Sequence, residues 1–186
     1  MFRFMVPAIA IVATAGLVFA GEKSATVKSG LEAGAQASAF NVRDITGPAK
    51  GTTLCYRCKY SASPTSAVFT REITPEVAEL IATLDKQVAE GKDKKIKAFV
   101  VLLTDDADAG AKQLEKLAAD KKITNVPLTI YDGVAGPDSY KIAKEAGVTV
   151  MSWNKLRVQT THAYAPGKMT ADDVKVVAAD TAKVAG

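Results

Sequence analysis

Histidine and cysteine are scarce in this chain of 186 residues, which has one histidine, His162, and two cysteines, Cys55 and Cys58. A structural zinc site usually takes four histidine or cysteine ligands, and the chain has no second cysteine pair to supply them. Covalent haem attachment needs a histidine directly after a Cys-x-x-Cys motif, and here Lys59 follows Cys58. We therefore predict no metal ion and no cofactor.

Long apolar runs are absent beyond residue 20, so no later segment reaches the roughly 20 residues that a membrane-spanning helix needs. The one long run, residues 4–19, follows the positive Arg3 and ends in small residues before Gly21. This pattern is typical of a secretory signal peptide, with a membrane anchor as the alternative. We predict that residues 1–20 are a signal peptide. The mature chain would then be exported, either periplasmic or secreted, without stable membrane insertion.

Aromatic residues make up 6% of the chain, and none alternates with its lysines. The net charge of +4 comes from 24 basic and 20 acidic residues, and the densest basic cluster is Lys92, Lys94, Lys95 and Lys97. Nucleic-acid binding surfaces combine basic grooves with stacking aromatic rings, so we predict no nucleic-acid partner. A solvated rim is the simplest interpretation of the lysines.

The order of apolar patterns predicts an α/β protein. Residues 21–38 are rich in small and polar types and predict a flexible leader, followed by one domain over residues 39–186. We expect a hairpin from 39–44 and 52–56, buried strands at 67–70, 98–104 and 126–131, and a closing hairpin from 148–153 and 156–164. Helices are expected after Thr74, through Leu114 and Leu117, from Pro137 to Gly147, and after Thr170. Alternating strands and helices favour a mixed central sheet with helices on both faces.

Four segments carry a resemblance to a known family. They are residues 40–47, 101–106, 126–132 and 140–148. Their order and composition resemble the peroxiredoxin-like branch of the thioredoxin superfamily, the alkyl hydroperoxide reductase and thiol-specific antioxidant group. The resemblance implies a thioredoxin-like three-layer sandwich with an N-terminal β-hairpin extension.

The chain departs from that family at the position of its chemistry. The family places its peroxide-attacking cysteine at the helix start after the first core strand, and here Thr74 precedes Pro75. A threonine hydroxyl is a far weaker acid than a thiol, so a helix dipole cannot make it a comparable nucleophile. The segment Val148–Val150 stands where the family has its cis-proline. Ordinary peroxidase or thioredoxin chemistry is therefore not expected at that position.

The pair Cys55 and Cys58 has the spacing of a redox dithiol, of a local structural disulfide, or of half a metal site. An exported chain meets oxidising conditions, and Arg57 and Lys59 favour the thiolate form if they lie nearby. A bridge that closes so small a loop adds little stability, which weakens a purely structural role. A structural clamp predicts buried sulfur atoms, whereas redox exchange needs accessible ones. Because the pair precedes the first core strand, we expect it near the strand's start, on the opposite side of the sheet from Thr74.

These observations predict a non-standard thiol–disulfide redox protein with Cys55 and Cys58 as catalytic residues. Its partner would be a protein thiol or disulfide. If the protein is an enzyme, it belongs to the thiol–disulfide oxidoreductase or antioxidant type. The alternative is a catalytically inactive binding or structural module of the same fold, in which the disulfide has a local structural role.

Two further candidates lie elsewhere in the chain. His162 is placed in an alternating strand, as a proton carrier or as an ordinary strand histidine. The residues after the first core strand, Arg71, Glu72 and Thr74, would bind an anion or form an ion pair and a helix cap.

A third candidate is acidic. The residues concerned are Asp105, Asp106 and Asp108. They would gather a hard cation or, more simply, stabilise a helix N-terminus.

Overall fold

The computed structural model describes residues 24–186, so the predicted signal peptide lies outside the described residues. The strands are β1 (Val42–Asp44), β2 (Thr53–Leu54), β3 (Thr65–Thr70), β4 (Lys97–Thr104), β5 (Leu128–Asp132), β6 (Val148–Asn154) and β7 (Arg157–Tyr164). They form one seven-stranded sheet in the order β2-β1-β5-β4-β3-β6-β7. β3, β4 and β5 pair in parallel and the other pairs are antiparallel. The predicted mixed sheet is confirmed.

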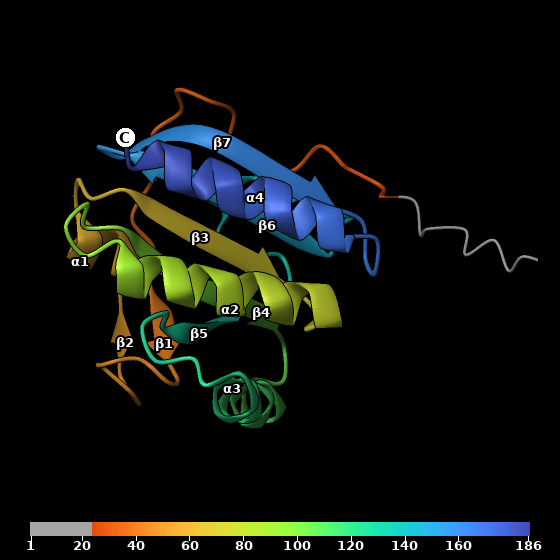
Figure 1. Cartoon of the computed structure of the whole chain (residues 1–186). Coiled ribbons are helices and arrows are strands. Elements are labelled where there is room, and N and C mark those ends of the chain that lie inside the picture. Colours follow the sequence, from red (N-terminus) through yellow and green to blue (C-terminus); the bar gives the residue numbers. More distant parts are fainter. Residues whose placement is uncertain (1–23) are drawn as a thin grey trace, which may run out of the picture.

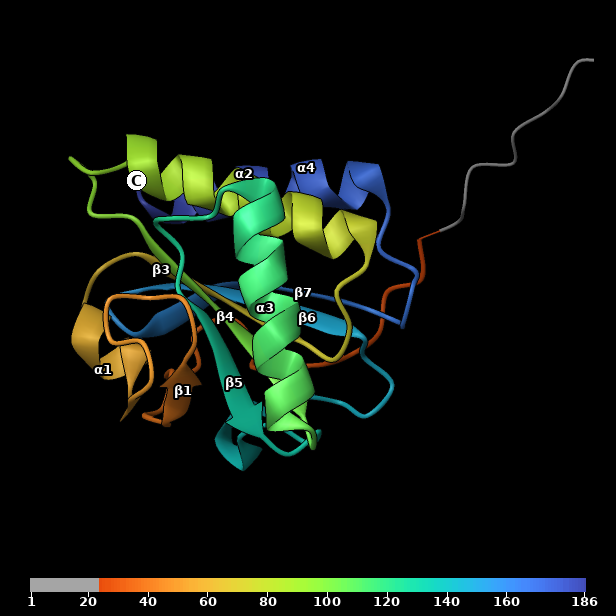
Figure 2. The same cartoon turned by 90° about the horizontal axis from the view of Figure 1, so that it is seen from below.

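The long helices cover one face of this sheet. They are α2 (Pro75–Glu90), α3 (Ala107–Lys121) and α4 (Ala171–Val184). Figure 1 shows α2 and α4 side by side on this face, and Figure 2 shows α3 against β5. Their apolar positions recur at helical spacing and pack on the strand residues Val68, Val100 and Val150. The two crossovers through α2 and α3 follow the same direction along the sheet, which places both helices on the same side.

Shorter elements cover the opposite face. These are α1 (Tyr56–Tyr60), the 3₁₀ turn η1 (Asp138–Tyr140) and the segment of residues 24–40. The core here is rich in aromatic rings, and it joins Phe69, Phe99 and Trp153 of the strands to Tyr56 of α1 and Tyr140 of η1. Helical elements therefore lie on both faces, which confirms the predicted three layers with an N-terminal hairpin.

The helix starts follow the sequence signals. The Thr74 hydroxyl accepts a hydrogen bond from Val77 N at 3.3 Å, and Pro75 occupies the first turn of α2. At α4, Thr170 and Asp173 form a reciprocal capping box. Burial would raise the pKa of the Asp173 carboxyl, but hydrogen bonds from Thr170 outweigh it and lower that pKa.

Three local predictions differ from the structure. Residues 24–38, predicted as a flexible leader, pack along β7 with bridges Thr26–Tyr164 and Gln36–Arg157. The chain also continues from β2 into α1, so the expected strand over residues 52–56 is only Thr53–Leu54. The expected helix over residues 137–147 is reduced to the turn η1. In each case tertiary contacts outweigh the local pattern. Among the described helices, none is long and apolar enough to cross a membrane.

Candidate functional site

Cys55 and Cys58 are joined by a disulfide at the start of α1, with their Cα atoms 5.2 Å apart. Cys55 is the N-cap residue, and its Sγ accepts a hydrogen bond from the backbone N–H of Cys58 at 3.0 Å. Cys58 is exposed and Cys55 is half-buried. Cys58 as a residue is therefore open to solvent, which a purely structural clamp does not require.

Hydrogen bonds from Tyr56 and Arg57 fix α1, the helix that carries the pair, to neighbouring segments of the chain. Tyr56 is buried, and its hydroxyl donates to Asp44 Oδ2 at 2.6 Å. Arg57 Nε donates to the carbonyl of Ala37 at 2.9 Å. Burial, followed by the hydrogen bond with Asp44, raises the pKa of the Tyr56 phenol above its usual value. The phenol therefore stays protonated and remains a hydrogen-bond donor. Its bond to Asp44 holds α1, and with it the disulfide, in place.

The position of the pair agrees with the sequence-based expectation. In Figure 1, α1 lies at the start of β3, whereas α2 begins beyond the end of that strand. The disulfide and Thr74 are thus at opposite ends of β3. This separation excludes a direct contact between the cysteine pair and the start of α2, where the peroxiredoxin-like family has its reactive cysteine.

Two lysine side chains lie over the rings of the α1 tyrosines. Lys59 Nζ lies 5.7 Å from the centre of the Tyr56 ring, and Lys97 Nζ lies 6.0 Å from that of Tyr60. Cation–π contacts of this kind hold an ammonium group over a ring while leaving its charge available to other groups.

The three residues after β3 have structural partners. Arg71 donates from Nε to the carbonyl of Val134 at 2.8 Å and from Nη1 to the carbonyls of Ala143 and Ala146. Glu72 accepts from the backbone N–H of Gly167. Burial lowers the pKa of the Arg71 guanidinium. Arg71 and Glu72 thus bond the backbone instead of forming the expected ion pair, while Thr74 caps α2 as predicted.

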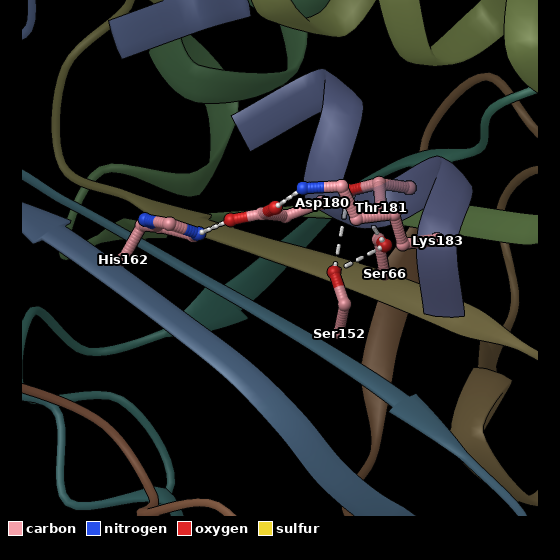
Figure 3. A network of polar contacts seen from close by, with 6 residues as sticks. All are labelled: Ser66, Ser152, His162, Asp180, Thr181 and Lys183. Carbon is pink, nitrogen blue, oxygen red and sulfur yellow. Dashed lines mark hydrogen bonds and ion pairs between the residues drawn. The ribbon is translucent and has the colours of Figure 1, made fainter. Parts of the chain in front are cut away.

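His162 lies beside α4 and not beside a nucleophile (Figure 3). Its Nε2 is 3.1 Å from Asp180 Oδ2, and Lys183 Nζ donates to Asp180 Oδ1 at 2.8 Å. The Lys183 bond, together with the nearby His162, lowers the pKa of the Asp180 carboxyl. The hydroxyls of Ser66, Ser152 and Thr181 bond one another in a separate buried cluster. The contact between His162 and Asp180 joins β7 to α4, which gives His162 a structural role.

The acidic residues after β4 do not form a metal site. Asp106 is the N-cap of α3 and accepts from Ala109 N at 2.9 Å. Within residues 24–186, no group of three or more acidic, histidine or cysteine side chains is placed to hold a metal ion. Helix capping, the simpler interpretation, accounts for Asp106.

Sequence reasoning missed the buried carboxylates that shape the site. Asp44 is fully buried and accepts from Gly47 N, Ala49 N and the Tyr56 hydroxyl. Its place at the end of a short strand before a Gly-Pro turn was the available signal. Its partnership with Tyr56 depends on the return of the chain after β2, which no local pattern specifies.

Comparison with known proteins gives similarity at the level of structure. No family model matches the chain, and no curated protein sequence matches it. A candidate thiol:disulfide interchange protein DsbE from Chlorobium tepidum has a TM-score of 0.62 at 12% identity, over 84% of this chain and 99% of that one. Peroxidoxin BcpB from Mycobacterium tuberculosis has a TM-score of 0.58 at 16% identity, over 82% and 97%. The thioredoxin domain of a thiol-disulfide oxidoreductase from Bacteroides vulgatus has a TM-score of 0.58 at 13% identity, over 81% and 97%.

Proposed function

We propose that this chain is an exported protein that exchanges thiols and disulfides through Cys55 and Cys58. The proposal is supported by its thioredoxin-like fold and its disulfide-bonded Cys-x-x-Cys pair. The observation that carries the proposal is the exposure of Cys58 on a helix that the bond from Tyr56 to Asp44 anchors. Thiol–disulfide exchange needs an accessible sulfur and a leaving thiolate that its surroundings stabilise.

The proposed first step is attack on the sulfur of the exposed residue Cys58. A partner thiolate attacks Cys58 Sγ, the Cys55–Cys58 bond breaks, and Cys55 leaves as a thiolate. The backbone N–H of Cys58, which already bonds Cys55 Sγ, supports that negative charge. The product is a mixed disulfide between Cys58 and the partner.

The second step completes a two-electron exchange. A second partner thiolate attacks the partner's sulfur in the mixed disulfide and releases Cys58 as a thiolate, so the partner is oxidised and the pair is reduced. In the reverse direction, the Cys58 thiolate attacks a partner disulfide and the Cys55 thiolate resolves the mixed disulfide. The difference in reduction potential between the two couples sets the direction.

The reduction potential of the pair tests this proposal. Equilibration in glutathione buffers followed by thiol trapping should give a value between about −120 and −270 mV, the range of known exchange catalysts. A value below about −300 mV, or sulfur atoms that react only after unfolding, would overturn the proposal.

Single cysteine variants test the assignment of roles. In Cys55→Ser the resolving thiolate is lost, so a mixed disulfide at Cys58 should accumulate with a dithiol or disulfide substrate. Cys58→Ser is the matched control and should trap much less, because the remaining cysteine is half-buried. Mass spectrometry of the trapped adducts measures both. Equal trapping by the two variants would contradict the assignment of Cys58 as the attacked sulfur.

The second candidate is a binding module without exchange activity. The observation in its favour is the dense fixing of α1, by the disulfide, by the bond from Tyr56 to Asp44 and by that from Arg57 to Ala37. Under this candidate the disulfide holds the chain at the turn from β2 into α1. The same potential measurement distinguishes the two, since a local clamp resists reduction.

Export is part of the main proposal and is supported by the apolar run before Gly21. Expression with the complete N-terminus, followed by fractionation and intact mass measurement, should give a mature chain that begins at Gly21. A chain that keeps residues 1–20 and stays with the membrane would favour the anchor instead.

A further inference from the structure

A groove of about 590 Å³ lies beside the helix that carries the disulfide. Its walls come from the Thr46–Pro48 turn, the end of α1, the end of α2, the start of β4 and the loop of residues 123–127. Its volume is within the usual range of ligand-binding clefts. These walls all lie at the end of the sheet where β3 and β4 begin, which is also the end where the disulfide lies.

The groove is positively charged and no carboxylate lines it. Its lining includes Lys59, Lys92 and Lys97. Many surface lysines elsewhere have acidic partners, such as Lys50 with Glu115 and Lys121 with Glu79. By contrast, no ion pair joins any of the three groove lysines to a carboxylate among residues 24–186. The groove therefore presents three ammonium groups without an ion-pair partner, while the carboxylates of Asp44 and Asp85 lie buried behind its walls.

Two buried carboxylates fix the walls of the groove. Asp44 holds the turn of residues 47–49 through the backbone N–H groups of Gly47 and Ala49. On the other side, Asp85 is 7% exposed and accepts hydrogen bonds from the backbone N–H groups of residues 124–126. Because both walls are held by buried hydrogen bonds, the groove is formed before any ligand arrives, which lowers the entropic cost of binding.

On α1, the lining of the groove begins at the residue that follows Cys58. Lys59 follows Cys58 in the chain, so their Cα atoms are about 3.8 Å apart, and Lys59 and Tyr60 line the groove while Cys58 is exposed next to it. A partner held in a mixed disulfide at Cys58 would therefore have its adjoining residues close to this groove.

We propose that this groove binds an extended acidic segment next to the reacting cysteine of the partner protein. The inference rests on the proposed exchange function and names the chemical class of its substrate. Carboxylates of the segment would meet the ammonium groups of Lys59, Lys92 and Lys97, which offer point charges without fixed bidentate geometry. Complementary charge would raise the rate of productive encounter more than the final affinity.

The test measures exchange between the purified protein and three synthetic peptides that each carry one disulfide. The peptides are of equal length and have aspartate, lysine or glutamine in the flanking positions. At low ionic strength the acidic peptide should react at least about 10-fold faster than the basic one, and added salt should reduce this ratio.

The double variant Lys92→Gln/Lys97→Gln locates the effect, because neither residue takes part in the sulfur chemistry. It should lose most of the preference for the acidic peptide and keep its rate with an uncharged small disulfide. The matched control, Lys116→Gln/Lys175→Gln, removes the same charge from lysines on α3 and α4 and should keep the preference.

The outcomes separate the two proposals. Equal rates with acidic and basic peptides, or the same loss in the control variant, would overturn the groove while leaving exchange intact. Failure to exchange with any peptide and with the uncharged disulfide would overturn the proposed function and the inference with it. Binding of a cysteine-free acidic peptide without any exchange would make the groove the site of a binding module and would also overturn the substrate assignment.

Discussion

Asp44 is the single residue on which the surroundings of the disulfide depend most. A carboxylate buried without donors is strongly unfavourable, and Asp44 has no exposed surface. Its two oxygens accept from Gly47 N at 2.7 Å, Ala49 N at 2.8 Å and the Tyr56 hydroxyl at 2.6 Å. One side chain therefore holds both the base of α1 and one wall of the adjoining groove.

Replacing the Tyr56 hydroxyl tests this arrangement. We expect Tyr56→Phe to lower the free energy of unfolding by about 1–3 kcal/mol, because the buried carboxylate loses one of its donors. Urea denaturation measures the change. Tyr131→Phe is the matched control and should cost less than about 0.5 kcal/mol, since Tyr131 is only partly buried. Equal losses in the two variants would contradict the special role of the Tyr56–Asp44 bond.

At the scale of elements, α2 begins with the N-cap residue Thr74, at the position where the peroxiredoxin-like family has its reactive cysteine. Thr74 accepts a hydrogen bond from Val77 N and leads into Pro75, so the helix start is well formed without a thiol. The helix start is thus complete at this position without the cysteine that the peroxiredoxin-like family has there.

We therefore expect Thr74→Ala to affect stability and not exchange. Loss of the cap should cost about 1 kcal/mol, measured by urea denaturation. The rate of thiol–disulfide exchange and the reduction potential of the pair should stay as in the wild type. Thr74→Ser keeps a hydroxyl and should recover most of the stability. A large fall in the exchange rate of Thr74→Ala would show that α2 takes part in the chemistry.

The sequence predicts those elements whose signals are local. The apolar run of β4 and the cap and spacing of α2 are read from adjacent residues, and both are where they were expected. Residues 52–56 are strand-forming types, yet the chain turns into α1. The reason is that the Tyr56 hydroxyl bonds to Asp44 and its ring packs on Phe99.

The candidate site is less predictable for the same reason. The spacing of Cys55 and Cys58 left a redox dithiol, a local disulfide and half a metal site open, whereas the topology correctly placed the pair at the start of β3. The groove, however, combines five separate segments of the chain. Lys59 and Lys97 line it together only because the tertiary fold brings their segments to the same place. The Asp180 partner of His162 lies on another element and has no local signal either.

Across the whole molecule, buried tyrosines couple stability to alkaline pH. Burial is the main cause that raises the phenol pKa values of Tyr56, Tyr60 and Tyr140, and it raises that of Tyr164 to about 12. In the unfolded chain these groups release their protons near pH 10. The folded state keeps them, so the stability that they contribute is complete below about pH 10 and is lost as the pH rises through the folded-state pKa values.

We expect the free energy of unfolding to fall steadily as the pH rises above about 10, as urea denaturation over a series of alkaline buffers would measure. Tyr140→Phe should show a shallower fall than the wild type, because one of the coupled phenols is removed. This comparison also separates the tyrosines from lysines, which titrate in the same range. Parallel pH profiles for the two proteins would contradict the coupling.

The segment of residues 24–38 has a consequence for how copies of this protein meet in a crowded compartment. Val27 N donates to Ala163 O, and Val158 exchanges bonds with the backbone of Gly34 and Ala35, so the outer side of β7 is already partly occupied. At the other border of the sheet, β2 is only two residues long. Exposed strand borders are templates on which further chains add and aggregate. Neither border here offers a long free template, so the sheet is protected against self-assembly into fibres.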